Sequence, residues 1–218
     1  LLSDKLKQIL SITDQTLIDD FVAQINGVGS CANVIGQVES LTNNNNKTVR
    51  GIIDWDLNNN PRKNILVCGY KYCYSIENLI LDPPSILLLL HIDKSLSFKD
   101  ICNKDVDWQH WLQNTALIQE SIDLFFYRVF SKNSNHDITL DYSSGLSLSF
   151  DKQYLTKQGH ELEQLLLQKY PALNAYRIKG KDDGLKMAIV NKAMIRLSNG
   201  LFIPKSFETV FEQVQQET

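Results

Sequence analysis

The sequence lacks an excess of positive charge. Lys and Arg total 22 against 25 Asp and Glu, which leaves a formal net charge of −3 over 218 residues. A protein that binds nucleic acid through its overall charge carries a surplus of Lys and Arg. Any nucleic-acid partner of this chain must therefore be held by a local basic patch, by metal ions or by another subunit.

Long hydrophobic runs are also missing. The very apolar stretch SILLLLHI, at residues 85–92, is much shorter than the roughly 20 residues that a membrane-spanning helix needs, and two prolines precede it. It is typical of a buried helix. The first residues carry no basic-plus-apolar leader, so we expect a cytoplasmic protein with no membrane partner.

Cysteine is scarce, and its spacing forms no complete metal motif. Cys68 and Cys73 lie in CGYKYC, but no second Cys or His pair completes the four ligands of a zinc site. We expect the cysteines to be buried or reduced thiols in a reducing cytoplasm. The sequence also lacks a G-x-x-x-x-G-K-[ST] loop, so ATP would have to be bound by a partner.

The pattern along the first part of the chain predicts an α/β fold. A helix over about 31–41 stands between candidate strands at 21–26 (FVAQIN) and 48–54 (TVRGIID), and a further strand follows at 64–70 (NILVCGY). Near-continuous apolar strands separated by a helix favour parallel pairing and a layered fold. We expect residues 1–94 to form a parallel-sheet core with helices on both faces.

The remainder, residues 95–218, predicts a mainly helical extension whose C-terminal segment returns to the core. A long helix is expected over 105–130, and in it the WQHW stretch is typical of core packing, or of an interface with a partner or a second copy. The segment 137–150 alternates apolar and polar residues around Ser-Ser-Gly, as a β-hairpin does. Three further helices are expected at about 152–169, 183–197 and 204–216.

Two aspartates stand where a buried strand should end. Asp54 and Asp56 of GIIDWD are alternate residues, so their side chains point to the same face, with Cα atoms about 6.6 Å apart. Ligands of α/β proteins bind at the carboxyl ends of parallel strands, and two carboxylates there repel each other unless a cation joins them. Mg²⁺ prefers such oxygen ligands. The alternative is that Asp54 caps the loop DLNNNP and that Asp56 is solvated.

A third acid follows the next strand. In YSIENLIL, at 74–81, Ser75 is expected to cap a helix and Glu77 to lie in its first turn. Loops after neighbouring parallel strands emerge side by side, so Glu77 would complete an acidic cluster with Asp54 and Asp56. The helix dipole alone also favours a Glu at this position, which leaves a structural role equally open.

These motifs together resemble a TOPRIM domain. GIIDWD followed by YSIENLIL is similar to the acidic motifs of OLD-family nucleases and of the TOPRIM effectors encoded beside ABC-type ATPases in bacterial phage-defence systems, such as PARIS. INGVGSCANVIGQVESL is similar to the strand–turn–helix that precedes those motifs. IKGKDDGLKMAI at 178–189 and IPKSFETVFEQV at 203–214 resemble the closing segments of the domain.

The resemblance implies a metal-dependent nuclease that acts as the effector of an antiviral defence system. Asp54 and Asp56 would bind Mg²⁺ or Mn²⁺, with Glu77 and Asp4 contributing, and the metal would polarise the scissile phosphate and activate water. Lys181 would stabilise the developing phosphate charge. DNA or RNA would be the substrate and an ABC-type ATPase the partner, with a homodimer as a further option.

Two features qualify the resemblance. The family carries an early Glu, followed by Gly and, four residues after the Glu, by an Asp. LLSDK matches only the end of this motif, at Asp4, so the Glu would precede residue 1; without it the chain would lack a metal ligand or general base. Taken without the resemblance, Lys179, Lys181 and Lys186 are typical of a solvated loop and helix end.

Two other functions stay open. Gly27, Gly29 and Ala32 follow a candidate strand and open a helix, which is the pattern of a dinucleotide-binding fold in which Asp54 would hold a ribose hydroxyl. That pattern does not explain Asp56. In the other alternative, the acidic fold is a non-catalytic interaction module held by an ATPase partner.

Overall fold

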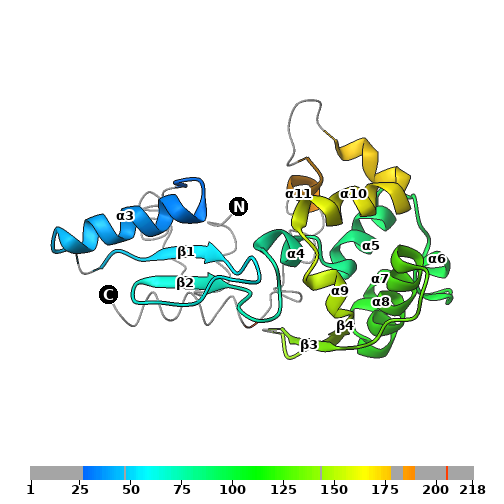
Figure 1. Ribbon diagram of the computed structural model, residues 1–218. Helices are drawn as coiled ribbons and strands as arrows, with labels where there is room; N and C mark the ends of the chain where they lie inside the picture. Colours follow the sequence, from blue (N-terminus) through cyan, green and yellow to red (C-terminus); the bar gives the residue numbers. More distant parts are fainter. Residues whose placement is uncertain (1–26, 47, 143, 178–183, 190–204, 206–218) are drawn as a thin grey trace, which may run out of the picture.

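The computed structural model describes residues 27–46, 48–142, 144–177, 184–189 and 205. In these residues the protein is a mixed α/β structure, mostly helical, with a two-stranded parallel sheet and a two-stranded antiparallel hairpin. The parallel strands and α3 lie at one end of the molecule, and the helices that follow lie with the hairpin at the other end (Figure 1).

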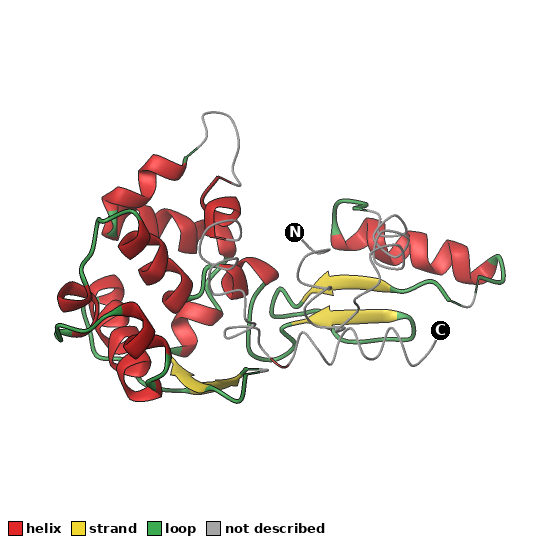
Figure 2. Cartoon of the chain, turned by 180° about the vertical axis from the view of Figure 1, so that it is seen from behind, coloured by secondary structure: helices red, strands yellow, loops and turns green. Residues whose placement is uncertain are grey.

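The sheet in the first half of the chain is parallel, as predicted. β1 (Gly51–Asp54) pairs with β2 (Ile65–Cys68) in a register that sets Asp54 opposite Cys68. Both strands therefore end at the same edge, and the loops that follow them leave the sheet side by side. This edge points toward the helical part of the molecule (Figure 2).

One helix packs on this sheet within the described residues. α3 (Cys31–Asn43) is capped by Ser30 and contacts β1. Gly51 permits the close approach, since a Cβ there would come within 2.8 Å of Val34 and of Ile65. A helix on the opposite face stays a prediction. The strand predicted at 21–26 lies outside the described residues.

The remaining helices and strands build the larger part of the described chain. In chain order they are α4 (Ile76–Ile80), α5 (Pro83–Ile92), α6 (Phe98–Cys102), α7 (Trp108–Leu112), α8 (Thr115–Phe130), β3 (Ile138–Asp141), β4 (Ser147–Phe150), α9 (Lys152–Leu155), α10 (Gly159–Lys169), the 3-10 helix η1 (Pro171–Tyr176) and α11 (Gly184–Ala188). The hairpin predicted at 137–150 is confirmed as antiparallel β3–β4. The helix predicted at 204–216 lies outside the described residues, except for Lys205.

The apolar stretch at 85–92 forms a buried helix, as predicted. Asp82 caps α5 by accepting a hydrogen bond from Ser85 N, and residues 83–90 are all buried. Two prolines occupy the first turn, where a missing N–H leaves no hydrogen bond unmade. No helix in the described part of the chain has both the length and the apolar content to cross a membrane.

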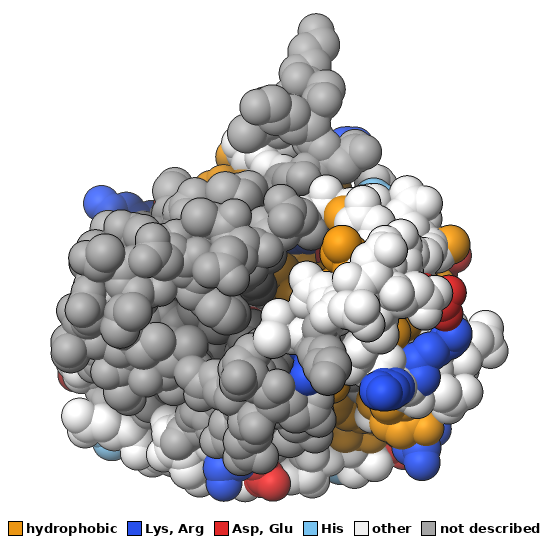
Figure 3. Space-filling view, turned by 90° about the vertical axis from the view of Figure 1, so that its left-hand side faces the viewer, with side chains coloured by type: hydrophobic (Ala, Val, Ile, Leu, Met, Phe, Trp, Pro, Cys, Tyr) orange, Lys and Arg blue, Asp and Glu red, His pale blue; other side chains and the backbone are white. Residues whose placement is uncertain are grey.

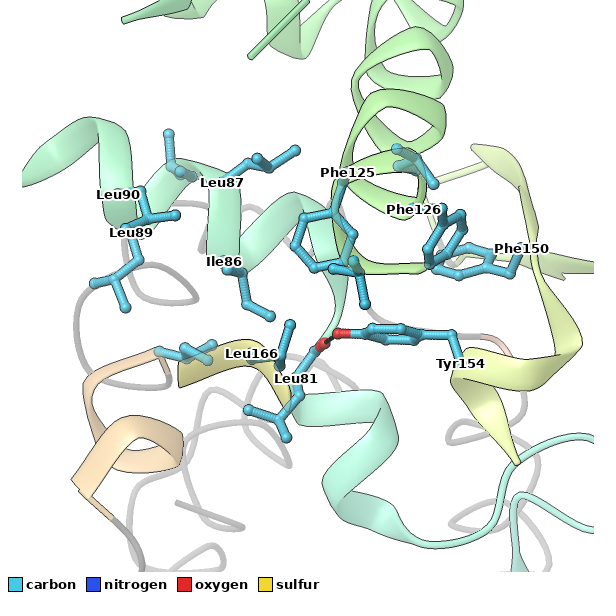
Figure 4. Packing of buried hydrophobic residues seen from close by; sticks show 14 of the residues in the cluster. Leu81, Ile86, Leu87, Leu89, Leu90, Phe125, Phe126, Phe150, Tyr154 and Leu166 are labelled. Atoms are coloured by element: carbon cyan, nitrogen blue, oxygen red, sulfur yellow. Dashed lines mark hydrogen bonds between the residues drawn. The ribbon is translucent and has the colours of Figure 1, made fainter. Parts of the chain in front are cut away.

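Aromatic side chains of α8 complete this core. Phe125 and Phe126 are fully buried and lie over the ring of Tyr154, whose hydroxyl donates to the carbonyl of Leu81 (Figure 4). α4 and α5 thus share one continuous hydrophobic cluster with the helices that follow residue 95. A separate, smaller cluster lies between α3 and the parallel sheet.

The prediction of one helix over 105–130 is wrong. The structure has two helices, because α7 ends at Leu112 and Asn114 caps α8 by accepting a hydrogen bond from Leu117 N. Trp111 and Ile118 lie on either side of the break, and both are buried in the same core. The apolar pattern of the sequence therefore continues through the break. Periodicity alone therefore did not reveal the interruption.

The prediction of one helix over 152–169 is also wrong. α9 ends at Leu155 and α10 begins at Gly159, because carbonyls in the interruption bond to other parts of the chain. Leu155 O accepts from Tyr74 N at 2.8 Å, and Lys157 O accepts from Asn78 Nδ2 at 2.8 Å. These long-range bonds replace hydrogen bonds within a continuous helix.

Asn78 is the buried polar residue that fixes α4 against this interruption. Its Nδ2 donates to Tyr154 O and Lys157 O, and its Oδ1 accepts from the backbone and hydroxyl of Ser75. Asn78→Ala would leave these buried groups without that partner, so we expect the free energy of unfolding to fall by about 2–4 kcal/mol. Urea denaturation measures it.

The matched control is Asn133→Ala, at an exposed position between α8 and β3. It should change the free energy of unfolding by less than about 0.5 kcal/mol. Equal losses in the two variants would contradict the role assigned to Asn78.

Candidate functional site

Asp54 joins the edge of the parallel sheet to the first turn of α4. It is the last residue of β1 and half-buried, and its Oδ1 accepts a hydrogen bond from Ile76 N at 2.9 Å. α4 begins here because Ser75 takes extended backbone angles and acts as N-cap, as predicted from YSIENLIL. The carboxylate thus satisfies one of the backbone amides that a helix N-terminus leaves without an intrahelical partner.

The environment of Asp54 disfavours its negative charge. Burial is the largest cause and raises the pKa of this carboxyl to about 6, against 3.8 for an ordinary Asp. The hydrogen bond from Ile76 acts in the opposite direction, and the charges of Glu77 and Asp56 raise the pKa further. Near neutral pH, the site therefore carries negative charge that burial disfavours.

Asp56 is held by a strained loop directly after the strand. Asp56 and Leu57 both adopt positive φ angles, of 48° and 62°, a conformation that costs energy in residues other than glycine. Asp56 N donates to Tyr74 O, and Asn59 Nδ2 donates to Asp54 O at 2.8 Å and to Asp56 Oδ2 at 3.5 Å. Burial, followed by the charge of Glu77, raises the pKa of Asp56.

Glu77 approaches the same region from the first turn of α4. Gly159, the first residue of α10, makes room for it, because a Cβ at Gly159 would lie 2.9 Å from the Cβ of Glu77. Glu161, in the first turn of α10, adds further negative charge. Burial raises the pKa of Tyr74, and the charges of Asp56, Glu161 and Asp54 raise it further.

Lys186 supplies positive charge to this acidic neighbourhood. Its Nζ lies 3.8 Å from Glu77 Oε1, and only 13% of its side chain is exposed. α11 positions it, since Leu185 and Ile189 on the same short segment are fully buried. The expectation that Lys186 belongs to a solvated helix end is therefore wrong.

Three of the five predicted site residues lie near one another, and the other two lie outside the described residues. Besides burial, the charges of Glu77 and Asp56 raise the pKa of Asp54, and the charge of Glu77 raises that of Asp56, so the three acids lie near one another. Asp4 and Lys181 lie outside the described residues. Within the described ranges, no group of three or more His, Cys, Asp or Glu side chains has the arrangement of a metal site. The predicted magnesium or manganese site stays a prediction.

The residues that support this site have weaker signals in the sequence. Lys186 stands in GKDDGLKMAI, where the resemblance drew attention to Lys181 instead. Asn59 lies in an asparagine-rich segment, and the composition of that segment indicates only a loop. Gly159 could be recognised only from the structure, because its importance comes from the contact with Glu77, which is distant in the sequence.

The two thiols nearest the site are buried and not activated. Burial is the main cause that raises the pKa of Cys68 to about 12, and the charges of Asp54 and Glu77 act in the same direction. Cys73 has its pKa raised for the same main reason, and its Sγ donates to Ser75 O at 2.9 Å. These thiols are structural, since a reactive cysteine needs a lowered pKa.

The dinucleotide-binding alternative places its glycines ahead of α3. Gly29 adopts a φ of +89° just before the capping residue Ser30. The strand that should precede this turn lies outside the described residues, and Asp54 accepts a backbone hydrogen bond from α4. This alternative stays a hypothesis.

Comparisons of the chain with protein-family models, curated proteins and solved structures find no match. The resemblance to TOPRIM nucleases therefore rests on the motifs quoted above.

The raised pKa of Asp54 predicts how the stability depends on pH. Because the pKa is about 6 in the folded state and 3.8 ordinarily, folding favours the protonated acid. This stabilisation is fully present below about pH 4 and is lost as the pH rises through 6. Asp54→Asn keeps an oxygen for Ile76 N and removes the charge. At pH 7.5 we expect its free energy of unfolding to exceed that of wild type by about 1–2 kcal/mol, because solvent partly screens the charge of this half-exposed carboxyl.

Urea denaturation in EDTA at pH 7.5 and pH 4 measures this difference, which should nearly disappear at pH 4. Asp105→Asn, which changes an exposed acid in the loop before α7, is the control and should show no such dependence on pH. A wild type more stable than Asp54→Asn at pH 7.5 would contradict the assignment.

Proposed function

We propose that this protein is a metal-dependent nuclease that hydrolyses phosphodiester bonds in DNA or RNA, with Asp54 and Asp56 as the central acids. The observation that carries the proposal is the half-buried Asp54 carboxylate, whose pKa of about 6 reflects burial and two neighbouring acids. Such a centre is stabilised by a cation, and it lies at the carboxyl edge of a parallel sheet, where α/β proteins bind ligands.

The donors fit Mg²⁺ or Mn²⁺ by their chemistry. Asp54 uses Oδ1 for Ile76 N, and among the described residues Asp56 Oδ2 has a long contact with Asn59 at 3.5 Å. Carboxylate oxygens are the ligands that these hard cations prefer, with water and phosphate completing the coordination. Asp54 and Asp56 would hold the ion with help from Glu77. A bound ion would supply Lewis acidity and an activated water.

Glu77 and Lys186 have complementary roles in this proposal. The Lys186 ammonium lies beside Glu77 on a buried support, so it is positioned without needing the substrate. A fixed cation next to a carboxylate cluster can bind a phosphate oxygen and stabilise the charge that develops on it during cleavage. Lys186 would thus share the role that the resemblance assigned to Lys181, which lies outside the described residues.

An exposed lysine near the acidic residues supports a nucleic-acid substrate. Lys71 is exposed in the turn after β2, at the edge of the sheet that carries Asp54, and its Nζ lies 5.0 Å from the centre of the Tyr70 ring. Figure 3 faces the end of the molecule that carries α3 and the parallel strands, away from the carboxyl edge, and there Lys and Arg side chains lie beside exposed hydrophobic ones with Asp and Glu among them. These scattered basic side chains can contact phosphates although the whole chain is acidic. An ABC-type ATPase or a second copy would supply further contacts.

Cleavage assays test the proposed activity. With Mg²⁺ or Mn²⁺, the protein and its ATPase partner should cleave plasmid DNA or RNA, and EDTA should stop the reaction. Asp54→Ala and Asp56→Ala should reduce cleavage to background, because each removes a carboxylate from the metal centre. The product is measured by gel electrophoresis of labelled substrate.

Asp105→Ala is the matched control and should keep full activity, since Asp105 is exposed and lies outside the acidic centre. Cleavage that persists in EDTA would contradict the metal mechanism. A protein that binds an ATPase partner but cleaves neither DNA nor RNA, with or without that partner, would favour the non-catalytic module.

Variants of Lys186 test whether this residue acts in catalysis or only stabilises the structure. Lys186→Ala should lower the cleavage rate constant by about 10²–10³-fold, the usual effect of removing one group that stabilises transition-state charge. The KM for the substrate should change much less, and Lys186→Arg should recover part of the rate because it keeps the charge.

The control is Lys169→Ala, which changes an exposed lysine at the end of α10. Rate loss in Lys186→Ala matched by an equal drop in thermal stability, with no recovery in Lys186→Arg, would contradict a role in catalysis.

A further inference from the structure

A separate cavity lies where α5 ends and α7 begins. Its volume is about 480 Å³, and the described residues that line it are Leu88, His91, Ile92, Lys94 and Trp108. Small-molecule sites are typically mostly apolar and have volumes of about 300–1,000 Å³, with a few polar groups that orient the ligand. This cavity matches that description, and none of these residues belongs to the acidic centre.

Trp108 provides an aromatic wall that the core does not use. Its exposed fraction is 40%, whereas that of Trp111, one turn further along α7, is 1%. Trp111 packs in the core and donates from Nε1 to Ser121 Oγ. The predicted packing role of WQHW therefore holds for Trp111, while Trp108 borders the cavity and can stack on a planar ring.

His91 is fixed in a defined orientation beside this wall. Its Nδ1 lies 3.0 Å from Leu96 O, and because a carbonyl only accepts, Nδ1 must carry the hydrogen. The ring also packs against Phe98, with centroids 4.3 Å apart. In the neutral imidazole, Nε2 is then a hydrogen-bond acceptor, which a ligand N–H group can satisfy.

Lys94 gives the cavity its preference for charge. It follows directly after the C-cap of α5, is exposed and adopts a φ of +60°, so its ammonium belongs to a turn at the rim. None of the described lining residues is Asp or Glu. Lys94 is thus the charged residue among the described lining residues, and its ammonium can pair with an anionic group of a ligand.

We propose that this cavity binds a small planar aromatic anion. The ring would stack on Trp108 above the apolar floor of Leu88 and Ile92, an N–H group would donate to His91 Nε2, and the anionic group would pair with Lys94. A mononucleotide and an aromatic carboxylate both carry this chemistry. The proposal does not depend on the nuclease activity.

Calorimetric titration of the full chain tests the proposal with two pairs of probes. Adenosine monophosphate is compared with adenosine, and indole-3-acetate with indole, so that each anion has an uncharged counterpart. At least one anion should bind, and its counterpart should bind about two- to fivefold more weakly, as expected for one exposed ion pair. The anion that binds identifies the source of the ligand.

Variants of the two exposed lining residues test the contacts. Trp108→Ala should weaken binding of that anion by about 5- to 100-fold, the range for loss of one stacking partner. Lys94→Ala should reduce its affinity to that of the uncharged counterpart, and Lys94→Arg should retain it. Thermal unfolding should be unchanged in the two Lys94 variants, since Lys94 is exposed, and Trp108→Ala should still unfold cooperatively, since Trp108 is 40% exposed.

Tyr127→Ala is the matched control, because Tyr127 is 56% exposed on α8 and is not among the lining residues. It should bind the anion like wild type. The proposal is overturned if neither anion binds at millimolar concentration, if the uncharged counterparts bind equally well, or if Trp108→Ala binds unchanged.

Discussion

The hydrogen bond from Ile76 N to Asp54 Oδ1 joins two parts of the protein that have separate hydrophobic clusters. Asp54 ends the sheet that packs with α3, while Ile76 begins α4 in the larger helical core. Neighbouring backbone bonds continue the junction, from Asp56 N to Tyr74 O and from Tyr74 N to Leu155 O. The acidic centre lies at this junction, so its geometry depends on how both clusters are held together.

This position has an electrostatic cost that the structure only partly offsets. The amide of Ile76 stabilises the Asp54 carboxylate, but burial and two neighbouring acids outweigh it, and the pKa settles near 6. Lys186 is close enough to Glu77 to reduce the repulsion, yet their separation of 3.8 Å is longer than a tight ion pair. Carboxyl groups whose pKa is raised by burial and by neighbouring acids are common at functional sites. A divalent cation would remove the repulsion among the acids, which links the stability of the junction to the proposed activity.

The sequence predicted the elements whose signals are local. Alternating residues predicted the hairpin, near-continuous apolar strands predicted parallel pairing, and Ser75 marked the start of α4. It failed at the interruptions near Asn114 and Thr156, because the apolar period continues across both. Helix propensity and periodicity describe one segment at a time. Lys157 O, by contrast, accepts a hydrogen bond from Asn78, which is far away in the sequence, instead of one within a helix. Tertiary hydrogen bonds decided these boundaries, and no local pattern encodes them.

The same interruption that escaped prediction also shapes the candidate site. Since α9 stops at Leu155, α10 can start again at Gly159, and this glycine meets Glu77 at a distance that no other residue would allow. Asn78, one residue after Glu77, bonds to the interruption and so holds the acid and the glycine in register. A continuous helix over 152–169 would retain its own carbonyl bonds and leave Asn78 without these acceptors. The interruption between α9 and α10 therefore helps to hold Glu77 near Asp54. The acids were predicted from their motifs, whereas the residues that support them depend on contacts between distant segments and were not.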